Sequence, residues 1–301
     1  MDDPPQAHRC IEAGRMPALP GKAPHALSVQ GGSLASGATR RALRVNVLAF
    51  DIETVPDVES GRRLLALEGL GDAEVARIMR QRQQQASGTE MMRHHLNRIV
   101  AIAVVLRSGD LFRVWPLGAV ESSERELVER FFDGIERYSP NLVSWNGGGF
   151  DLPVLHYRAM LHGVGAPRYW ESGDDDQSFR WNNYLNRFHS RHTDLMDVLG
   201  GYQPRAWAPL DDIAQMLGFP GKLGMDGSGV WDAYAAGEVE RIRAYCEIDV
   251  LNTFLVYLRY ELIRGRLSPD AYERECEVVR DGLREDERDH LAEFLRAWAP
   301  S

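Results

Sequence analysis

Asp51 and Glu53 stand two positions apart at the carboxyl end of an apolar stretch that begins at Val45. The β-branched and aliphatic residues of this stretch are typical of a strand that is buried on both faces. Side chains alternate along a strand, so the two carboxylates project from the same face, close to each other. Both are ionised at neutral pH, and a hard divalent cation such as Mg²⁺ or Mn²⁺ would relieve their repulsion. The pair predicts half of a metal site, although two solvated carboxylates at a strand end would give the same pattern.

A third carboxylate follows a glycine-rich loop. The six residues from Asn146 to Asp151 contain three consecutive glycines and lie between a short apolar strand at 142–145 and a predicted helix over 152–162. Glycines allow backbone conformations and close approaches that other residues do not. Neither the dinucleotide-binding pattern nor the phosphate-binding loop with its lysine is present. The loop either brings Asp151 towards Asp51 and Glu53, or leaves it as a helix cap.

The longest helical pattern covers residues 237–265 and contains Tyr245 and Asp249. These two residues are four positions apart and therefore share one face of the helix. A buried helix face that carries a carboxylate needs a partner. A metal ion shared with Asp51 and Glu53 would provide it, which completes a constellation suited to two-metal phosphodiester hydrolysis.

These three segments resemble the three motifs of the DEDDy 3′–5′ exonucleases, and in particular the predicted exonucleases related to the proofreading domain of family-B DNA polymerases. The stretch from Phe50 to Thr54 is similar to the first motif, the stretch from Asn146 to Asp151 to the second, and Tyr245 with Asp249 to the third. The group's histidine variant would need His at position 244, where this chain has Ala244. The resemblance covers about residues 45–265.

The resemblance implies two divalent cations, Mg²⁺ or Mn²⁺, held by four carboxylates. Asp51 would bridge both ions, Glu53 and Asp249 would complete the site that activates the attacking water, and Asp151 would hold the second ion through water. Tyr245 is neutral at pH 7 and would orient the nucleophile by a hydrogen bond. Side chains of the motifs would contact the 3′ nucleotide of the substrate: Thr54, Asn146 and Phe150.

The resemblance also implies an α/β chain of the ribonuclease H-like fold, with a mixed five-stranded sheet, its first three strands antiparallel, and helices on both faces. Periodicity predicts strands at 99–106 and 111–115 joined as a hairpin, and either a last strand or a short helix at 193–199. Further helices are predicted at 61–69, 72–85, 121–138 and 210–217, and two amphipathic helices at 268–298.

The domain organisation predicted from composition has three parts. Residues 1–44 are rich in Pro, Gly, Ala and Ser and are expected to form a disordered leader, residues 45–265 the exonuclease domain, and residues 266–301 a C-terminal helical extension. The segment after Asp249 is too short for a polymerase palm domain, so we expect a free-standing nuclease or one that acts in trans with replication or repair proteins.

Two loops have open interpretations. Residues 165–192 mix carboxylates, arginines and aromatic side chains, which either bind a single nucleic-acid strand or cover the core. The acidic group Glu171, Asp174, Asp175 and Asp176 fits either a metal site or a solvated surface. Lys222 lies in the loop 218–229, where its ammonium group either meets a substrate phosphate or belongs to an ordinary surface loop.

The composition excludes several classes of protein. The chain has 301 residues, 44% of them hydrophobic and 26% charged, and has no apolar run near the ~20 residues of a membrane helix. Its three scattered cysteines show no metal or disulfide pattern and favour the reducing cytoplasm. The formal net charge of −9 fits poorly with nucleic-acid binding, which usually requires a basic surface, although an enzyme that holds a strand end through metal ions needs less basic surface.

The function predicted from the sequence is a metal-dependent 3′–5′ exonuclease that acts on the 3′ ends of single-stranded DNA. An exoribonuclease or oligonucleotidase would use the same chemistry, and contacts to the 2′-hydroxyl would distinguish them. A catalytically silent nucleic-acid-binding protein is the alternative from another class. A nucleotide-binding oxidoreductase is excluded because its glycine fingerprint is absent.

Overall fold

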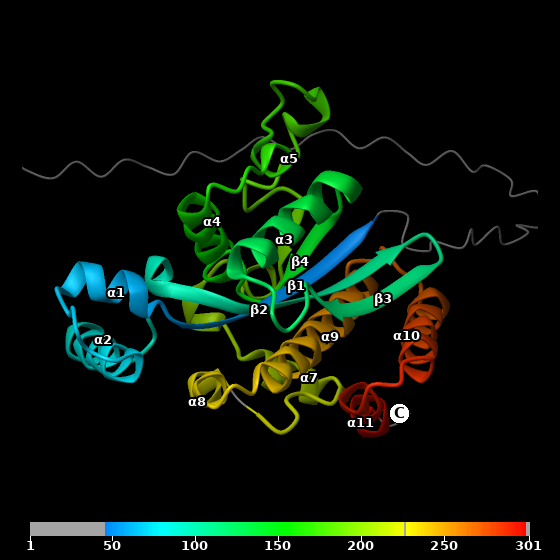
Figure 1. Cartoon of the computed structure of the whole chain (residues 1–301). Coiled ribbons are helices and arrows are strands. Elements are labelled where there is room, and N and C mark those ends of the chain that lie inside the picture. Colours follow the sequence, from blue (N-terminus) through cyan, green and yellow to red (C-terminus); the bar gives the residue numbers. More distant parts are fainter. Residues whose placement is uncertain (1–45, 226, 299–301) are drawn as a thin grey trace, which may run out of the picture. The chain divides into compact units, whose positions relative to one another are not determined.

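The computed structural model describes residues 46–225 and 227–298. The predicted leader at 1–44 lies outside these residues. Figure 1 labels most of the strands and helices described below.

A mixed five-stranded sheet forms the centre of this part of the chain, in the spatial order β3-β2-β1-β4-β5. The first three strands in the sequence pair antiparallel, and β4 and β5 join parallel to β1. The sequence-based prediction of an α/β fold with this sheet is confirmed. The strands are β1 (Val47–Pro56), β2 (Asn97–Ser108), β3 (Leu111–Pro116), β4 (Asn141–Ser144) and β5 (His192–Asp194).

Helices cover both faces of the sheet (Figure 1). On one face, α3 (Glu124–Tyr138) and α4 (Asp151–His162) share an apolar cluster with Leu48, Phe50 and Ile52 of β1. On the other face, the 25-residue helix α9 (Val239–Ile263) packs on Val47, Ala49 and Val55 of the same strand. Because β1 is buried on both sides, its polar residues Asp51 and Glu53 can only face an internal site.

Side-chain caps fix where α1 and α3 begin. The hydroxyl of Ser123 accepts a hydrogen bond from the backbone N–H of Glu126, so α3 begins at Glu124, three residues later than predicted. The carboxylate of Asp57 accepts one from the N–H of Ser60, so α1 begins at Val58, before the predicted start at Gly61. Periodicity alone does not locate such starts, because the capping residue lies outside the periodic pattern.

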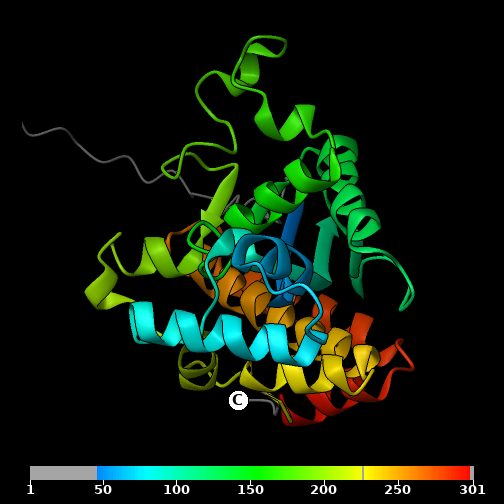
Figure 2. The same ribbon diagram turned by 60° about the vertical axis from the view of Figure 1, so that its left-hand side comes forward.

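Two helices are inserted between β1 and β2. They are α1 (Val58–Leu65) and α2 (Asp72–Ser87), and they enclose a small apolar cluster built on Val75, Met79 and Met92. Figure 2 shows α2 in cyan, in front of the long helix α9. After α2 the chain returns through Met91 and a 3₁₀ turn to β2.

The predicted ambiguity at 193–199 is resolved by the structure, which contains both a strand and a helix: β5 ends at Asp194 and α6 begins at Leu195. The helices α5 and α8 were not predicted, because four to six residues give no readable period. The short helices are α5 (Pro167–Trp170), α6 (Leu195–Leu199), α7 (Leu210–Met216) and α8 (Val230–Ala235). The 3₁₀ turns are η1 (His94–Leu96), η2 (Gln177–Phe179), η3 (Pro204–Ala206) and η4 (Gly227–Gly229).

The two C-terminal helices, α10 (Pro269–Arg284) and α11 (Asp289–Ala297), share the apolar cluster of α9. A buried ion pair joins Arg107 of β2 to Glu275 of α10, with 2.8 Å between Nε and Oε2. The predicted domain boundary at residue 265 stays a prediction, and the core continues across it. Among the described residues, no helix combines the length and apolar character needed to span a membrane.

Candidate active site

The first motif lies on β1, where Asp51 and Glu53 face α9. A carboxylate oxygen of each lies within 4.8 Å of the other and of the Cys246 sulfur. The pairing of β1 with β2 shifts register between Glu53 and Thr54, directly after the two carboxylates. Such irregularities re-aim side chains and are frequent next to active sites.

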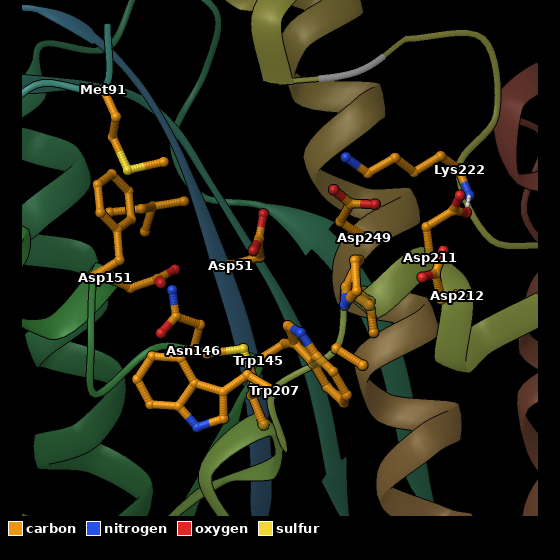
Figure 3. A pocket seen from close by; sticks show the side chains of 16 residues that line it. Asp51, Met91, Trp145, Asn146, Asp151, Trp207, Asp211, Asp212, Lys222 and Asp249 are labelled. Carbon is orange, nitrogen blue, oxygen red and sulfur yellow. Dashed lines mark hydrogen bonds between the residues drawn. The ribbon is translucent and has the colours of Figure 1, made fainter. Parts of the chain in front are cut away.

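The second motif is the turn between β4 and α4. Asn146 adopts a left-handed backbone with φ 61°, and a Cβ at Gly147 would collide with the side chain of Ser144. The glycine at this position is therefore required by a close approach. The turn places Asp151 as the first residue of α4, facing Asp51 across the site (Figure 3).

Asp194 at the end of β5 holds this turn in place. Its Oδ1 accepts a hydrogen bond from the N–H of Asn146 and its Oδ2 one from the N–H of Gly148, both at 2.9 Å. Asp194 is buried and uses both oxygens for the loop. It is thus a positioning residue, a role that its local sequence does not indicate.

The third motif lies on α9, which packs directly on β1. Tyr245, Cys246 and Asp249 are all buried at this contact. The thiol of Cys246 donates to the backbone oxygen of Asp51 at 3.3 Å and lies 3.4 Å from its Oδ2. Oδ1 of Asp249 is buried without a hydrogen-bond partner among the described residues. An unpartnered, buried carboxylate oxygen is costly unless a ligand satisfies it.

Burial and neighbouring negative charges raise the pKa values of all four carboxylates. Burial, followed by Asp151, Glu53 and Asp249, raises the pKa of Asp51 well above its usual range. Burial likewise raises the pKa of Asp151 to about 7 and that of Asp249 to about 6. Burial and the charges of Asp249 and Asp151 raise the pKa of Glu53. The site therefore concentrates negative charge that it does not neutralise by itself.

Tyr245 stays protonated in this surrounding. Burial, together with Asp249 and Glu53, raises the pKa of its hydroxyl far above the usual range. A neutral hydroxyl donates a hydrogen bond, and interaction with it lowers the pKa of Asp249 in return.

Lys222 is the only lysine among the described residues, and it faces the carboxylates. Its charge lowers the pKa of both Glu53 and Asp249, and its Nζ lies 5.6 Å from the centre of the Tyr245 ring. The side chain of Asn252 makes two hydrogen bonds with the backbone of Gly221, and Asp211 accepts from the N–H of Lys222 at 2.7 Å. These bonds hold the Lys222 loop in place. The structure therefore favours an ammonium group positioned at the site over an ordinary surface loop.

A cavity of about 760 Å³ opens onto three of the four carboxylates, Asp51, Asp151 and Asp249, whereas Glu53 does not line it. Figure 3 shows Asp51 between Asp151 and Asp249, with Lys222 beside Asp249 and the indole rings of Trp145 and Trp207 below. The apolar part of the wall suits a flat base or sugar, and the charged part suits a phosphate. The lining residues are Asp51, Ile52, Met91, Trp145, Asn146, Phe150, Asp151, Met196, Trp207, Ala208, Pro209, Leu210, Asp211, Asp212, Lys222 and Asp249.

The donor set fits divalent cations. Four carboxylates converge, one of their oxygens lacks a partner among the described residues, and the lysine offsets only part of their charge. Mg²⁺ and Mn²⁺ prefer such oxygen ligands. Cys246 could also offer its sulfur, but burial and the charge of Asp51 raise the pKa of the thiol, which favours a hydrogen-bond donor over a thiolate ligand.

The predicted substrate residues divide into two groups. Asn146 and Phe150 line the cavity, and the Phe150 ring lies 5.7 Å from that of His94, whose Nε2 lies 2.9 Å from the carbonyl oxygen of Gly149. Thr54 does not line the cavity, and its hydroxyl bonds to Oδ1 of Asn97 at 3.2 Å. Strand alternation alone does not explain this, because Ile52 lines the cavity and Glu53 does not. The pairing of β1 with β2 shifts register directly before Thr54.

The acidic group of the 165–192 segment has local roles. Glu171 accepts hydrogen bonds from the backbone of the turn that follows it, and Asp176 pairs with Arg168 at 2.9 Å. Neither residue lines the cavity. The interpretation of this group as a loop surface is the one that the structure supports.

The comparisons with known proteins agree with this geometry. A family model described as predicted 3′–5′ exonuclease related to the exonuclease domain of PolB matches residues 89–298. The chain belongs to this exonuclease family. The matched range contains Asp151, Tyr245 and Asp249 and begins after the first motif.

Curated relatives of the exonuclease are DNA polymerases. The chain is 27% identical over 145 residues to the catalytic subunit of DNA polymerase epsilon from Emericella nidulans, which is 46% of this chain and 6% of that protein. It is 27% identical over 129 residues to a DNA polymerase of Pyrococcus glycovorans, 41% of this chain and 16% of the polymerase. It is 53% identical over 38 residues to DNA polymerase 1 of Sulfurisphaera ohwakuensis, 13% of this chain and 4% of that protein. The similarity thus covers a small part of each polymerase.

Several residues of the exonuclease site carried no local signal in the sequence. Asp194, Asn252 and Trp207 act through contacts between distant segments, and each looks ordinary in its own stretch. Lys222 carried a weak signal, because a single lysine in a glycine-rich loop is unusual in this arginine-rich chain.

Proposed function

We propose that this protein is a metal-dependent 3′–5′ exonuclease that removes nucleotides from the 3′ end of single-stranded DNA. The observation that carries the proposal is the unpartnered Oδ1 of Asp249, which lies in a cluster of four carboxylates with raised pKa values at a cavity. Family membership supports 3′–5′ exonuclease activity in general.

Two divalent cations, Mg²⁺ or Mn²⁺, would be held by Asp51, Glu53, Asp151 and Asp249. When bound, they supply an activated water and stabilise the negative charge on the leaving 3′ oxygen. The carboxylates would remain the ligands throughout, and the cations would offset the burial and the repulsion that raise the pKa values of Asp51 and Glu53.

The remaining side chains bind and orient. Tyr245 is neutral and buried beside Asp249, so it would donate a hydrogen bond that orients the attacking water. Lys222 would place its ammonium against the scissile phosphate. Asn146 and Phe150 at the opposite wall would hold the sugar and base of the 3′ nucleotide. The role proposed for Thr54 has no support from the cavity.

DNA is proposed over RNA because the curated relatives are DNA polymerases. The test uses the purified chain with 5′-labelled single-stranded DNA and RNA of one sequence, with Mn²⁺ or Mg²⁺, and with Asp51→Ala as the control. Shortening of the DNA from its 3′ end, absent in the control, is expected. Faster cleavage of RNA would support an exoribonuclease, and intact binding without cleavage of either strand would support the silent binding protein.

A further inference from the structure

A row of aromatic side chains leads outwards from the wall of the cavity. We call Trp207, Tyr202 and Phe188 the aromatic strip. Trp207 lines the cavity and is 41% exposed, and Phe188 is 70% exposed, which is unusual for a large apolar ring. The strip thus begins inside the candidate active site and ends on the surface.

Two separate contacts hold the members of the aromatic strip in place. Trp207 packs on Gly200, where a Cβ would approach its Cδ1 to 2.9 Å. Two residues further on, the ring of Tyr202 meets that of Phe188 edge to face, with 4.9 Å between centroids. Tyr202 and Phe188 therefore form one packed pair, and the short chain segment that begins at Gly200 connects this pair to Trp207.

Arg187 supports this surface without adding net charge. Its guanidinium group lies over both rings, 4.9 Å from the centre of Tyr202 and 5.8 Å from that of Phe188. Its Nη2 pairs with Oδ2 of Asp197 at 2.6 Å. The charge of Arg187 is thus neutralised by Asp197. The strip therefore offers a ligand an aromatic surface and little electrostatic attraction for phosphate.

The backbone at Tyr202 is strained. Its φ is 60°, in the left-handed region that a residue with a large side chain rarely adopts. Such strain persists where the surrounding structure holds it, and it is concentrated at ligand-binding and active sites. Here the conformation turns the Tyr202 ring towards Phe188.

Two other aromatic residues of the 165–192 segment have the opposite arrangement, whereas Trp181 is exposed like Phe188. Phe179 is fully buried beneath the guanidinium of Arg191, at 3.7 Å, and Tyr184 is buried and donates to the carbonyl oxygen of Pro140 at 2.7 Å. The two sequence-based interpretations of this segment therefore apply to different residues. Phe179 and Tyr184 cover the core, whereas the ring of Phe188 stays accessible to a ligand.

We propose that the aromatic strip is a stacking platform for the bases of a single nucleic-acid strand whose 3′ end occupies the cavity. This inference rests on the proposed function and adds the path that the strand takes. Every base has a π-face, so a platform of rings binds a strand without sequence preference. It also requires little positive charge, which agrees with the net charge of −9.

The test compares long and short substrates. Binding of a labelled 12-nucleotide single strand, DNA and RNA in turn, is measured by fluorescence anisotropy in an Asp51→Asn background with Mg²⁺. Phe188→Ala and Tyr202→Ala should each weaken binding of the 12-mer roughly 5- to 150-fold, which corresponds to the loss of one base stack. Cleavage of a dinucleotide by the same variants with Asp51 intact should change less than about twofold.

Tyr138→Ala is the matched control. Like the rings of the strip, the Tyr138 ring lies beneath an arginine, with the Arg137 guanidinium 5.1 Å from its centre. Its backbone oxygen accepts a hydrogen bond from Asn46, which precedes β1 at the end of the strand away from the site. This variant should bind and cleave both lengths as the parent does. Because stacking is uncharged, Phe188→Ala should also leave the salt dependence of 12-mer binding unchanged.

Unchanged binding of the 12-mer by both strip variants would overturn the inference, and so would an equal loss on both substrate lengths. A parent protein that cleaves no substrate would contradict the proposed function instead. The binding measurement would then still decide whether single strands use the strip, and a preference between the DNA and RNA 12-mers would identify the strand.

Discussion

The thiol of Cys246 lies 3.4 Å from Oδ2 of Asp51 and 3.3 Å from its backbone oxygen. This contact joins α9 to β1 at the point where the carboxylates of the two elements meet. The thiol contacts Asp51 from the side of α9 and orients its carboxylate, which also lines the cavity. The strand and the helix thus present their carboxylates to the cavity as one unit.

Replacement of the thiol tests this orienting role. Cys246→Ala removes the donor and should lower kcat roughly 2- to 10-fold, in line with the loss of one weak hydrogen bond. Cys246→Ser keeps a donor of similar size and should retain most of the activity. The measurement is the cleavage rate of single-stranded DNA at saturating Mn²⁺. Equal rates for the alanine and serine variants would show that the contact only fills space.

The stability of the metal-free protein should fall as pH rises. The pKa of Asp151 is raised to about 7 and that of Asp249 to about 6, whereas both lie near ~4 in the unfolded chain. A raised folded-state pKa gives stability that is complete below the unfolded value and is lost as pH rises through the folded value. Thermal unfolding in EDTA should therefore show a decrease in Tm between about pH 4 and 7.

Divalent cations should reverse that decrease. Mn²⁺ binds the ionised carboxylates of the folded state, so the gain in Tm on its addition should be larger at pH 8 than at pH 5. Asp249→Asn should reduce the gain at pH 8, because it removes one ligand and its charge. If the gain in Tm depended neither on pH nor on Asp249, Mn²⁺ would bind at a site other than these carboxylates.

Lys222→Gln should separate metal binding from catalysis. The ammonium lowers the pKa of Glu53 and Asp249, and the same charge repels a cation. Its removal should let Mn²⁺ bind more tightly, yet reduce kcat/KM about 10- to 100-fold through the lost charge-assisted contact with phosphate. Arg241→Gln, an exposed cation on the same helix as Asp249, is the control. Weaker Mn²⁺ binding by Lys222→Gln would contradict the assignment.

Asp194→Ala should disturb the glycine turn without removing any proposed ligand. The variant loses two hydrogen bonds from the backbone of Asn146 and Gly148, which should cost roughly 3 kcal/mol of unfolding free energy. Since the turn carries Asn146 and Asp151, KM should also rise. Urea unfolding and steady-state kinetics measure the two effects. A loss of stability with unchanged KM would limit Asp194 to a structural role.

Whether a site residue could be predicted from the sequence depends on how far apart along the chain its interacting partners lie. Asp51 with Glu53, and Tyr245 with Asp249, share a face because of the period of a single element, and that period can be read from the chain. The number of strands in the sheet and their directions followed from the family resemblance, whereas their spatial order comes from the structure. Trp207 and Lys222 reach the cavity through turns and loops whose course depends on distant residues such as Asn252. Such contacts leave no local pattern.

The most direct test of the central claim is the time course of cleavage of a 5′-labelled single-stranded DNA by the parent and by Asp249→Asn. Each is measured with Mn²⁺, with EDTA, and with a substrate whose 3′-terminal linkage is a phosphorothioate. The account predicts a ladder that shortens from the 3′ end, requires Mn²⁺, is delayed by the modified linkage, and slows by at least about 100-fold in Asp249→Asn. Internal cleavage, or a variant as active as the parent, would contradict it.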